Sequence, residues 1–157
     1  MPYVLILEDI DSDVREVEAA LEQIGRYDLK RFEAASRAIE ALSDALKANQ
    51  ELPALIIVDL NLPQSSGYEL LRFIHSTPPI QSVPCAVWTV MDTDVDRKLT
   101  TWMGSRKLIS KNSGPATLRK SLASLLKNGE GSESGSNKDS AKAKSSLEPG
   151  RRPPKRA

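Results

Sequence analysis

The stretch LIIVDLNLPQSSG, residues 55–67, indicates the fold of this chain more clearly than any other. Four apolar residues lead directly into the carboxylate of Asp59, and a loop with a proline and a glycine follows. An unbroken apolar run of this length is typical of a strand that is buried on both faces, as in a parallel sheet. The stretch therefore predicts a buried strand that ends on an acid. No basic residue lies near that acid in the sequence.

Strand-like and helix-like segments alternate along the rest of the chain. Short apolar runs predict five strands, at residues 3–7, 29–34, 54–58, 85–90 and 107–110. Apolar residues spaced three or four apart predict a helix after each strand, and Pro115 suits the first turn of the last one. Because strands that alternate with helices form parallel sheets covered on both faces, we expect a doubly wound α/β fold with five strands and five helices.

One of these helices, at about residues 93–103, carries four apolar residues on one face. They are Val95, Leu99, Trp102 and Met103. We expect this face to pack within the domain, and the alternative is that Trp102 and Met103 form a surface for a partner.

Composition bounds the class of protein. The chain has 157 residues, a formal charge of +1 and a single cysteine, Cys85, which lies in an apolar run and suits a reducing compartment. No apolar stretch approaches the roughly 20 residues that cross a bilayer, and residues 1–10 do not resemble a signal peptide. We therefore expect a cytoplasmic protein without a membrane span.

The last 29 residues differ from the rest in composition. Residues 129–157 hold seven Lys or Arg and four Asp or Glu, a net charge of +3, with one leucine and three alanines as their only apolar residues. They predict a disordered basic tail after a domain at residues 1–128. Its end, RRPPKR, could bind an acidic partner or a membrane surface, or could simply be solvated. The tail is too short and too polar to form a DNA-binding module, so no DNA partner is expected.

Polar residues stand at the carboxyl ends of the predicted strands. Glu8 and Asp9 follow the first strand, Asp59 follows the third, Thr89 stands at the end of the fourth and Lys111 follows the fifth. Because these ends meet at one edge of a parallel sheet, three acids, a hydroxyl and an ammonium converge there. Three neighbouring carboxylates repel one another unless a cation lies between them, and Mg²⁺ suits such a site because it needs few carboxylates.

The same set of residues suits phosphoryl chemistry. The Asp59 carboxylate could attack a phosphoryl group and hold it as an aspartyl phosphate. The metal and Lys111 would neutralise charge on the phosphoryl oxygens. Thr89 could then donate a hydrogen bond to the bound phosphoryl group and draw its own loop inward, which would make a covalent switch.

These motifs resemble those of response-regulator receiver domains of two-component signalling. The likeness covers about residues 3–127, and four sequence motifs carry it: ILED at 6–9, VDLNLPQSSG at 58–67, WT at 88–89 and ISK at 109–111. The resemblance implies the flavodoxin-like strand order 2-1-3-4-5. It also implies a switch that accepts a phosphoryl group from a sensor histidine kinase and catalyses only its own phosphorylation and dephosphorylation.

The resemblance assigns a role to each matching position. Asp59 would be the phosphoacceptor, with Mg²⁺ bound by Glu8, Asp9, Asp59 and the backbone carbonyl of Asn61. Thr89 would sense the phosphoryl group and Lys111 would pair with it. A haloacid-dehalogenase-like phosphatase is set aside, because it needs a second acid two residues after the nucleophile, where this chain has Asn61.

The chain also departs from the family pattern. Asn112 stands where the family usually has a proline, Leu108 where it often has an aromatic residue, and Val90 and Met91 are bulkier than usual. These departures keep a second hypothesis open, a receiver-like binding module that signals without phosphate. The long segment 43–53, together with DLNLP, is similar to stand-alone regulators that partner phytochrome-like histidine kinases.

The absence of a predicted output domain leaves protein contacts as the route of signalling. We expect an unidentified downstream protein as the partner. We also expect a homodimer through the face made by the helix at about 93–103, the strand at 107–110 and the last helix.

Overall fold

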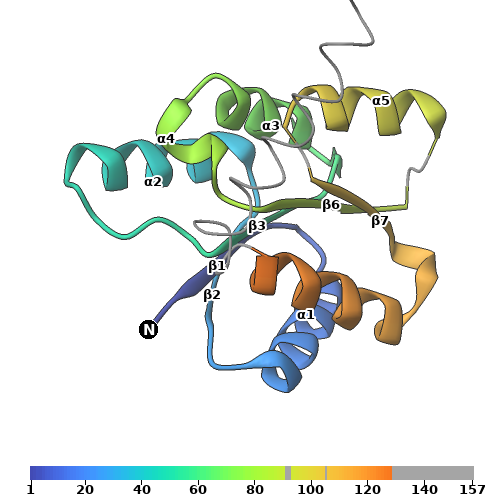
Figure 1. Ribbon diagram of the computed structural model, residues 1–157. Coiled ribbons are helices and arrows are strands. Elements are labelled where there is room, and N and C mark those ends of the chain that lie inside the picture. Colours follow the sequence, from blue (N-terminus) through green and yellow to red (C-terminus); the bar gives the residue numbers. More distant parts are fainter. Residues whose placement is uncertain (91–92, 105, 129–157) are drawn as a thin grey trace, which may run out of the picture.

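The computed structural model describes residues 1–90, 93–104 and 106–128 of the chain (Figure 1). The predicted disordered tail, residues 129–157, lies outside the described residues, and so does Met91.

Five parallel strands form the central sheet, in the order β2-β1-β3-β6-β7. Their bounds are β1 Tyr3–Leu7, β2 Asp28–Phe32, β3 Leu55–Val58, β6 Cys85–Thr89 and β7 Lys107–Ser110. Numbered in chain order within this sheet, they follow the predicted order 2-1-3-4-5. The two missing labels belong to a small antiparallel hairpin after β3, formed by β4 (Asn61–Leu62) and β5 (Ser65–Ser66). The doubly wound fold is therefore confirmed.

Helices cover both faces of the sheet, as Figure 1 shows. Helices α2 (Ala35–Lys47), α3 (Gly67–His75), α4 (Pro78–Gln81) and α5 (Asp94–Trp102) lie on one face. Helix α1 (Asp11–Ile24) and the last helix, residues 115–128, lie on the other. The described residues thus hold six helices where five were predicted. The addition is α4, because the two prolines that end α3 also suit the first turn of a new helix.

The core lies in two layers, one on each side of the sheet. Strand β3 contributes side chains to both layers. Ile56 and Val58 belong to the layer under α2 and α3, and Leu55 and Ile57 belong to the layer under α1 and the last helix. All four residues are at most 1% exposed. The unbroken apolar run of β3 is therefore explained by burial on both faces, which holds Asp59 rigidly at the end of the strand.

Helix α5 is turned the opposite way from the prediction. Val95, Leu99 and Trp102 are 64%, 41% and 68% exposed, whereas Asp96 and Thr100 are buried. Of the four predicted packing residues, only Met103 is buried, so the prediction was wrong for the other three.

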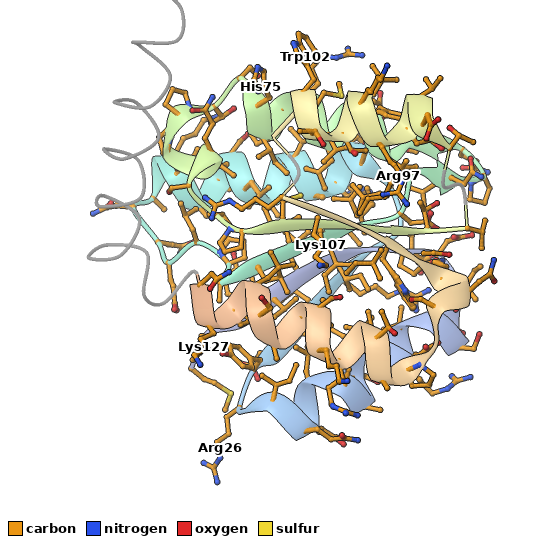
Figure 2. All side chains as sticks on the ribbon, turned by 45° about the vertical axis from the view of Figure 1, so that its right-hand side comes forward. Arg26, His75, Arg97, Trp102, Lys107 and Lys127 are labelled. Carbon is orange, nitrogen blue, oxygen red and sulfur yellow. The ribbon has the colours of Figure 1, made fainter. Side chains whose placement is uncertain are left out.

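The orientation of α5 follows from its first turn. Thr93 and Asp96 form a capping box, and the hydroxyl of Tyr68 in α3 donates a 2.7 Å hydrogen bond to Asp96. This contact turns the side of the helix that carries Asp96 toward the molecule and leaves its apolar side facing solvent, where Figure 2 shows Trp102 pointing away from the sheet. In the part of the chain that the structure describes, no helix is long and apolar enough to cross a bilayer.

Candidate functional site

Three acids meet at the carboxyl edge of the sheet. Strands β1 and β3 pair in parallel with Leu7 opposite Val58, so the residues that follow each strand become neighbours. Carboxylate oxygens of Glu8, Asp9 and Asp59 lie within 4.8 Å of one another. Glu8 is 1% exposed and Asp59 5% exposed, and Asp9 is half-buried. The structure thus brings together the three acids that the sequence placed at this edge.

Lys111 reaches into this cluster from the end of β7, the strand at one side edge of the sheet. It begins a single 3₁₀ turn, η1 (Lys111–Ser113), directly after β7. Its Nζ lies 2.7 Å from Glu8 Oε1, 2.7 Å from Asp13 Oδ2 and 3.2 Å from Asp59 Oδ2. The described residues contain no cis peptide bond, so the bond from Lys111 to Asn112 is trans. Lys111 therefore reaches Asp59 without the proline that the family usually has after the lysine.

Asp13 is a member of the site that the sequence analysis missed. It lies in the first turn of α1, where an acid suits the positive end of the helix, so a structural role accounts for it in the sequence. Asp9 lies before α1 begins at Asp11, so helical spacing does not relate these two acids. The contact between Asp13 and Lys111, 98 residues apart, depends on the tertiary structure.

Burial dominates the protonation chemistry of the cluster. It raises the pKa of Glu8 to about 7, and the charge of Asp59 acts in the same direction, against the hydrogen bond from Lys111. Burial by itself would lower the pKa of Lys111, but the bonds to Asp13 and Glu8 outweigh it and raise that pKa. Lys111 is therefore a cation at neutral pH. It is a single positive charge among several carboxylates. The excess of carboxylate oxygens and of negative charge suits a hard divalent cation.

The loop after β3 holds Asp59 from its other oxygen. The backbone N–H of Asn61 donates to Asp59 Oδ1 at 3.1 Å. At the far end of the hairpin, the N–H of Gly67 donates to the carbonyl of Leu60 at 3.3 Å. A Cβ at Gly67 would overlap the carbonyl oxygen of Asp59 and lie 2.8 Å from Val58 Cγ1. Glycine is required here because the start of α3 passes directly against the backbone of Asp59.

Thr89 ends β6 at the same edge and is fully buried, opposite Ser110 of β7. Leu108, which stands where the family often has an aromatic residue, is half-buried and packs against the core layer under α2 and α3. Cys85 is fully buried, and burial raises the pKa of its thiol to about 12, which fits the expected role of a small core residue. The candidate site residues Glu8, Asp9, Asp59, Asn61, Thr89 and Lys111 therefore lie at the carboxyl edge of the sheet, whereas Cys85 begins β6 at the opposite edge.

Comparison with known proteins gives a family for this arrangement. Residues 4–123 match the model of the response regulator receiver domain. The chain is 33% identical over 126 residues to response regulator Rre1 of Synechocystis sp., and the match covers 80% of this chain and 52% of Rre1. The chain thus spans about half the length of that relative.

Solved structures with the same fold include two regulators whose descriptions name a phytochrome or a metal. One is the phosphorylated cyanobacterial phytochrome response regulator RcpA, with a TM-score of 0.68 and 23% identity, covering 81% of this chain and 92% of RcpA. The other is the Mn²⁺-bound form of response regulator Rcp1, with a TM-score of 0.66 and 24% identity, covering 80% of this chain and 91% of Rcp1. At these identities the likeness shows the fold alone.

Proposed function

Because the chain belongs to the response regulator receiver domain family of two-component signalling, we propose that Asp59 accepts a phosphoryl group from a histidine kinase with the help of Mg²⁺. Receiver domains are phospho-accepting switches rather than enzymes that turn over a separate substrate. The observation that carries the proposal is the position of Lys111, whose ammonium lies 3.2 Å from Asp59 Oδ2 at the end of a buried strand.

The reaction uses the Asp59 carboxylate as a nucleophile. One of its oxygens forms a bond to phosphorus while the bond from phosphorus to the imidazole nitrogen of a phosphohistidine breaks, and its electron pair stays on that nitrogen. Lys111 neutralises negative charge on the phosphoryl oxygens. The N–H of Asn61 holds the Asp59 side chain in one orientation, as the 3.1 Å hydrogen bond indicates. The hydroxyl of Thr89, at the end of β6, donates a hydrogen bond to the transferred phosphoryl group.

Mg²⁺ is the cation that we propose for the acidic cluster. Glu8, Asp9 and Asp59 would hold it, with the backbone carbonyl of Asn61 as a further ligand, and the bound ion would supply positive charge to the phosphoryl oxygens. A regulator with the same fold, Rcp1, is described in an Mn²⁺-bound form, which supports a divalent ion in this chain.

The finer proposals concern partners. The description of RcpA as a phytochrome response regulator supports a phytochrome-type kinase as the donor. We place the reaction in the cytoplasm, with output through an unidentified protein and without DNA binding. The exposed apolar residues of α5 support a homodimer through the face of α5, β7 and the last helix, since Val95, Leu99 and Trp102 lie on that helix.

Acetyl phosphate tests the proposal directly. Intact-mass measurement of the protein with Mg²⁺ and acetyl phosphate, or with its kinase, should show one added phosphoryl group that hydroxylamine removes, as it does an acyl phosphate. Chelation of Mg²⁺ with EDTA and the variant Asp59→Asn should each abolish the addition. Wild-type protein that stays unmodified with both donors would replace this proposal with the phosphate-independent binding module.

A further inference from the structure

Arg31 in strand β2 contacts the loop that carries two of the site's acids. Its backbone pairs with Ile6, one residue before β1 ends, and its side chain reaches the segment that follows β1. The guanidinium Nε donates to the carbonyl oxygen of Glu8 at 3.0 Å, and Nη2 donates to the carbonyl oxygen of Asp9 at 2.8 Å. Nη1 donates to Asp11 Oδ1 at 2.6 Å. One planar group thus binds three residues of a four-residue segment.

These contacts act on the backbone from which the metal-binding carboxylates project. A carbonyl oxygen held by an N–H fixes the orientation of its peptide plane, and the two planes held here follow Glu8 and Asp9 directly. The loop is tied at two further points. The Glu8 N–H donates to the carbonyl of Phe32 at 2.9 Å, and the Ile10 N–H donates to Glu8 Oε2 at 3.2 Å. A rigid guanidinium with several donors suits this task better than an ammonium.

We propose that Arg31 is a positioning residue for the divalent-cation site, and that its guanidinium fixes the segment 8–11 so that the carboxylates of Glu8 and Asp9 converge with Asp59. The inference rests on the proposed function, because that function supplies the role of Mg²⁺. Arg31 itself binds no metal. It acts on the site through the two peptide groups and the Asp11 side chain, while a longer 3.8 Å contact from Nη2 reaches Glu33 in the segment after β2.

Charge and position predict effects of opposite sign for Arg31. A cation next to a metal site repels a divalent ion, so the loss of its charge alone would tighten Mg²⁺ binding. If the guanidinium holds the loop in place, its loss weakens Mg²⁺ binding, because the ion must then order a segment that was ordered beforehand. The direction of the change therefore separates the two effects.

The test is an Mg²⁺ titration of the full chain. Arg31→Ala should weaken Mg²⁺ binding about tenfold, as is typical when a group that orients metal ligands is removed. Arg31→Lys keeps the positive charge but loses the planar guanidinium with its three hydrogen bonds, so this variant should also bind Mg²⁺ more weakly than the wild type. Arg37→Ala is the matched charge control, since the Arg37 side chain is 76% exposed and its guanidinium lies 3.8 Å from Glu40. It should leave Mg²⁺ affinity unchanged.

Hydrogen exchange of the metal-free protein gives a second, independent measurement. The Ile10 amide should exchange faster in Arg31→Ala and Arg31→Lys than in the wild type or in Arg37→Ala. A merely structural role would lower the melting temperature without this local change. Where Arg31→Ala does not fold, Arg31→Lys carries the comparison.

The outcomes distinguish this inference from the proposed function. Wild-type protein that does not bind Mg²⁺ would overturn the metal role in the proposed function. Wild-type protein that binds Mg²⁺, together with an Arg31→Lys variant that binds it equally or more tightly and shows unchanged Ile10 exchange, would overturn the positioning role of Arg31 alone.

Discussion

Asp59 and Asp96 are both buried among the described residues, but their surroundings differ. Asp59 is 5% exposed and Asp96 is 9% exposed. Asp96 accepts hydrogen bonds from two neutral groups, the Tyr68 hydroxyl at 2.7 Å and the Thr93 N–H at 3.4 Å. These donors come from two different segments, so the carboxylate joins the start of α5 to α3. Its role is to hold structure.

Asp59 accepts one bond from a neutral N–H and one from the ammonium of Lys111. Carboxylates of Glu8 and Asp9 lie within 4.8 Å of its own. Such a site is held together by one shared cation and would bind a second cation readily. The comparison teaches that burial alone does not make an acid chemically active. Neutral donors on both oxygens produce a structural link, whereas neighbouring acids and a shared lysine produce a site for charge.

The largest expected difference between the two aspartates is in phosphorylation. Asp59→Asn should abolish phosphoryl transfer while keeping the fold, because the side chains have nearly equal volume and the change removes repulsion from Glu8. Asp96→Asn should still accept a phosphoryl group but lose about 1–2 kcal/mol of unfolding free energy, since one of its two acceptors becomes a donor. Intact-mass analysis and urea unfolding of both variants measure the contrast. Phosphorylation of Asp59→Asn on another residue would contradict it.

Lys111→Ala should have the next largest effect. Three carboxylates then lose their shared cation, so at pH 8 without metal we expect a loss of about 3 kcal/mol in unfolding free energy. The phosphorylation response should also be impaired. Added Mg²⁺ should restore part of the stability, because it replaces the missing positive charge. Lys120→Ala, on the exposed side of the last helix, is the control, and an equal loss in both variants would contradict the role of Lys111.

The pH dependence of stability should reveal Glu8. Its pKa is raised from 4.5 to about 7 in the folded protein, first by burial and then by Asp59. The resulting stabilisation is present below pH 4.5 and is lost as the pH rises through 7, because the unfolded state releases the proton first. In metal-free protein, the stability of the wild type relative to Glu8→Gln should fall by about 2 kcal/mol over this window. Glu18→Gln, at an exposed position, is the control. The stability of the wild type relative to this variant should stay constant over the same pH window.

Tyr68→Phe should have the smallest effect of the four. It removes one neutral donor from Asp96 and should cost about 1 kcal/mol of unfolding free energy without changing phosphorylation at Asp59. Burial, followed by the bond to Asp96, raises the pKa of Tyr68 to about 12, so this contribution is present below pH 10 and lost as the pH rises through 12. Denaturant unfolding across this range measures it. Tyr3→Phe is the control. It should cost less unfolding free energy, since the Tyr3 hydroxyl lies 3.5 Å from the Glu51 carbonyl oxygen, a longer and weaker contact.

The sequence predicted most of the fold because its signals are local. The LIIV run marks a strand buried on two faces, and alternation of strands with helices leads to a parallel sheet. The helix α4 was missed because prolines that stop one helix can also begin another. The orientation of α5 was predicted wrongly because the hydrogen bond between Tyr68 and Asp96 outweighs the apolar stripe of the helix.

The sequence by itself determined the sheet, the edge at which Glu8, Asp9, Asp59 and Lys111 gather, and the family to which these motifs belong. Strand period and strand ends can be read along the chain, and parallel strands place those ends together. Only the tertiary structure decided which side chains touch there. Lys111 and Glu8 stand 103 residues apart, and Lys111 also binds Asp13. Besides the Asp11 carboxylate, Arg31 contacts two peptide carbonyls. No sequence pattern records those two contacts, because they depend on the direction of a side chain from a neighbouring strand.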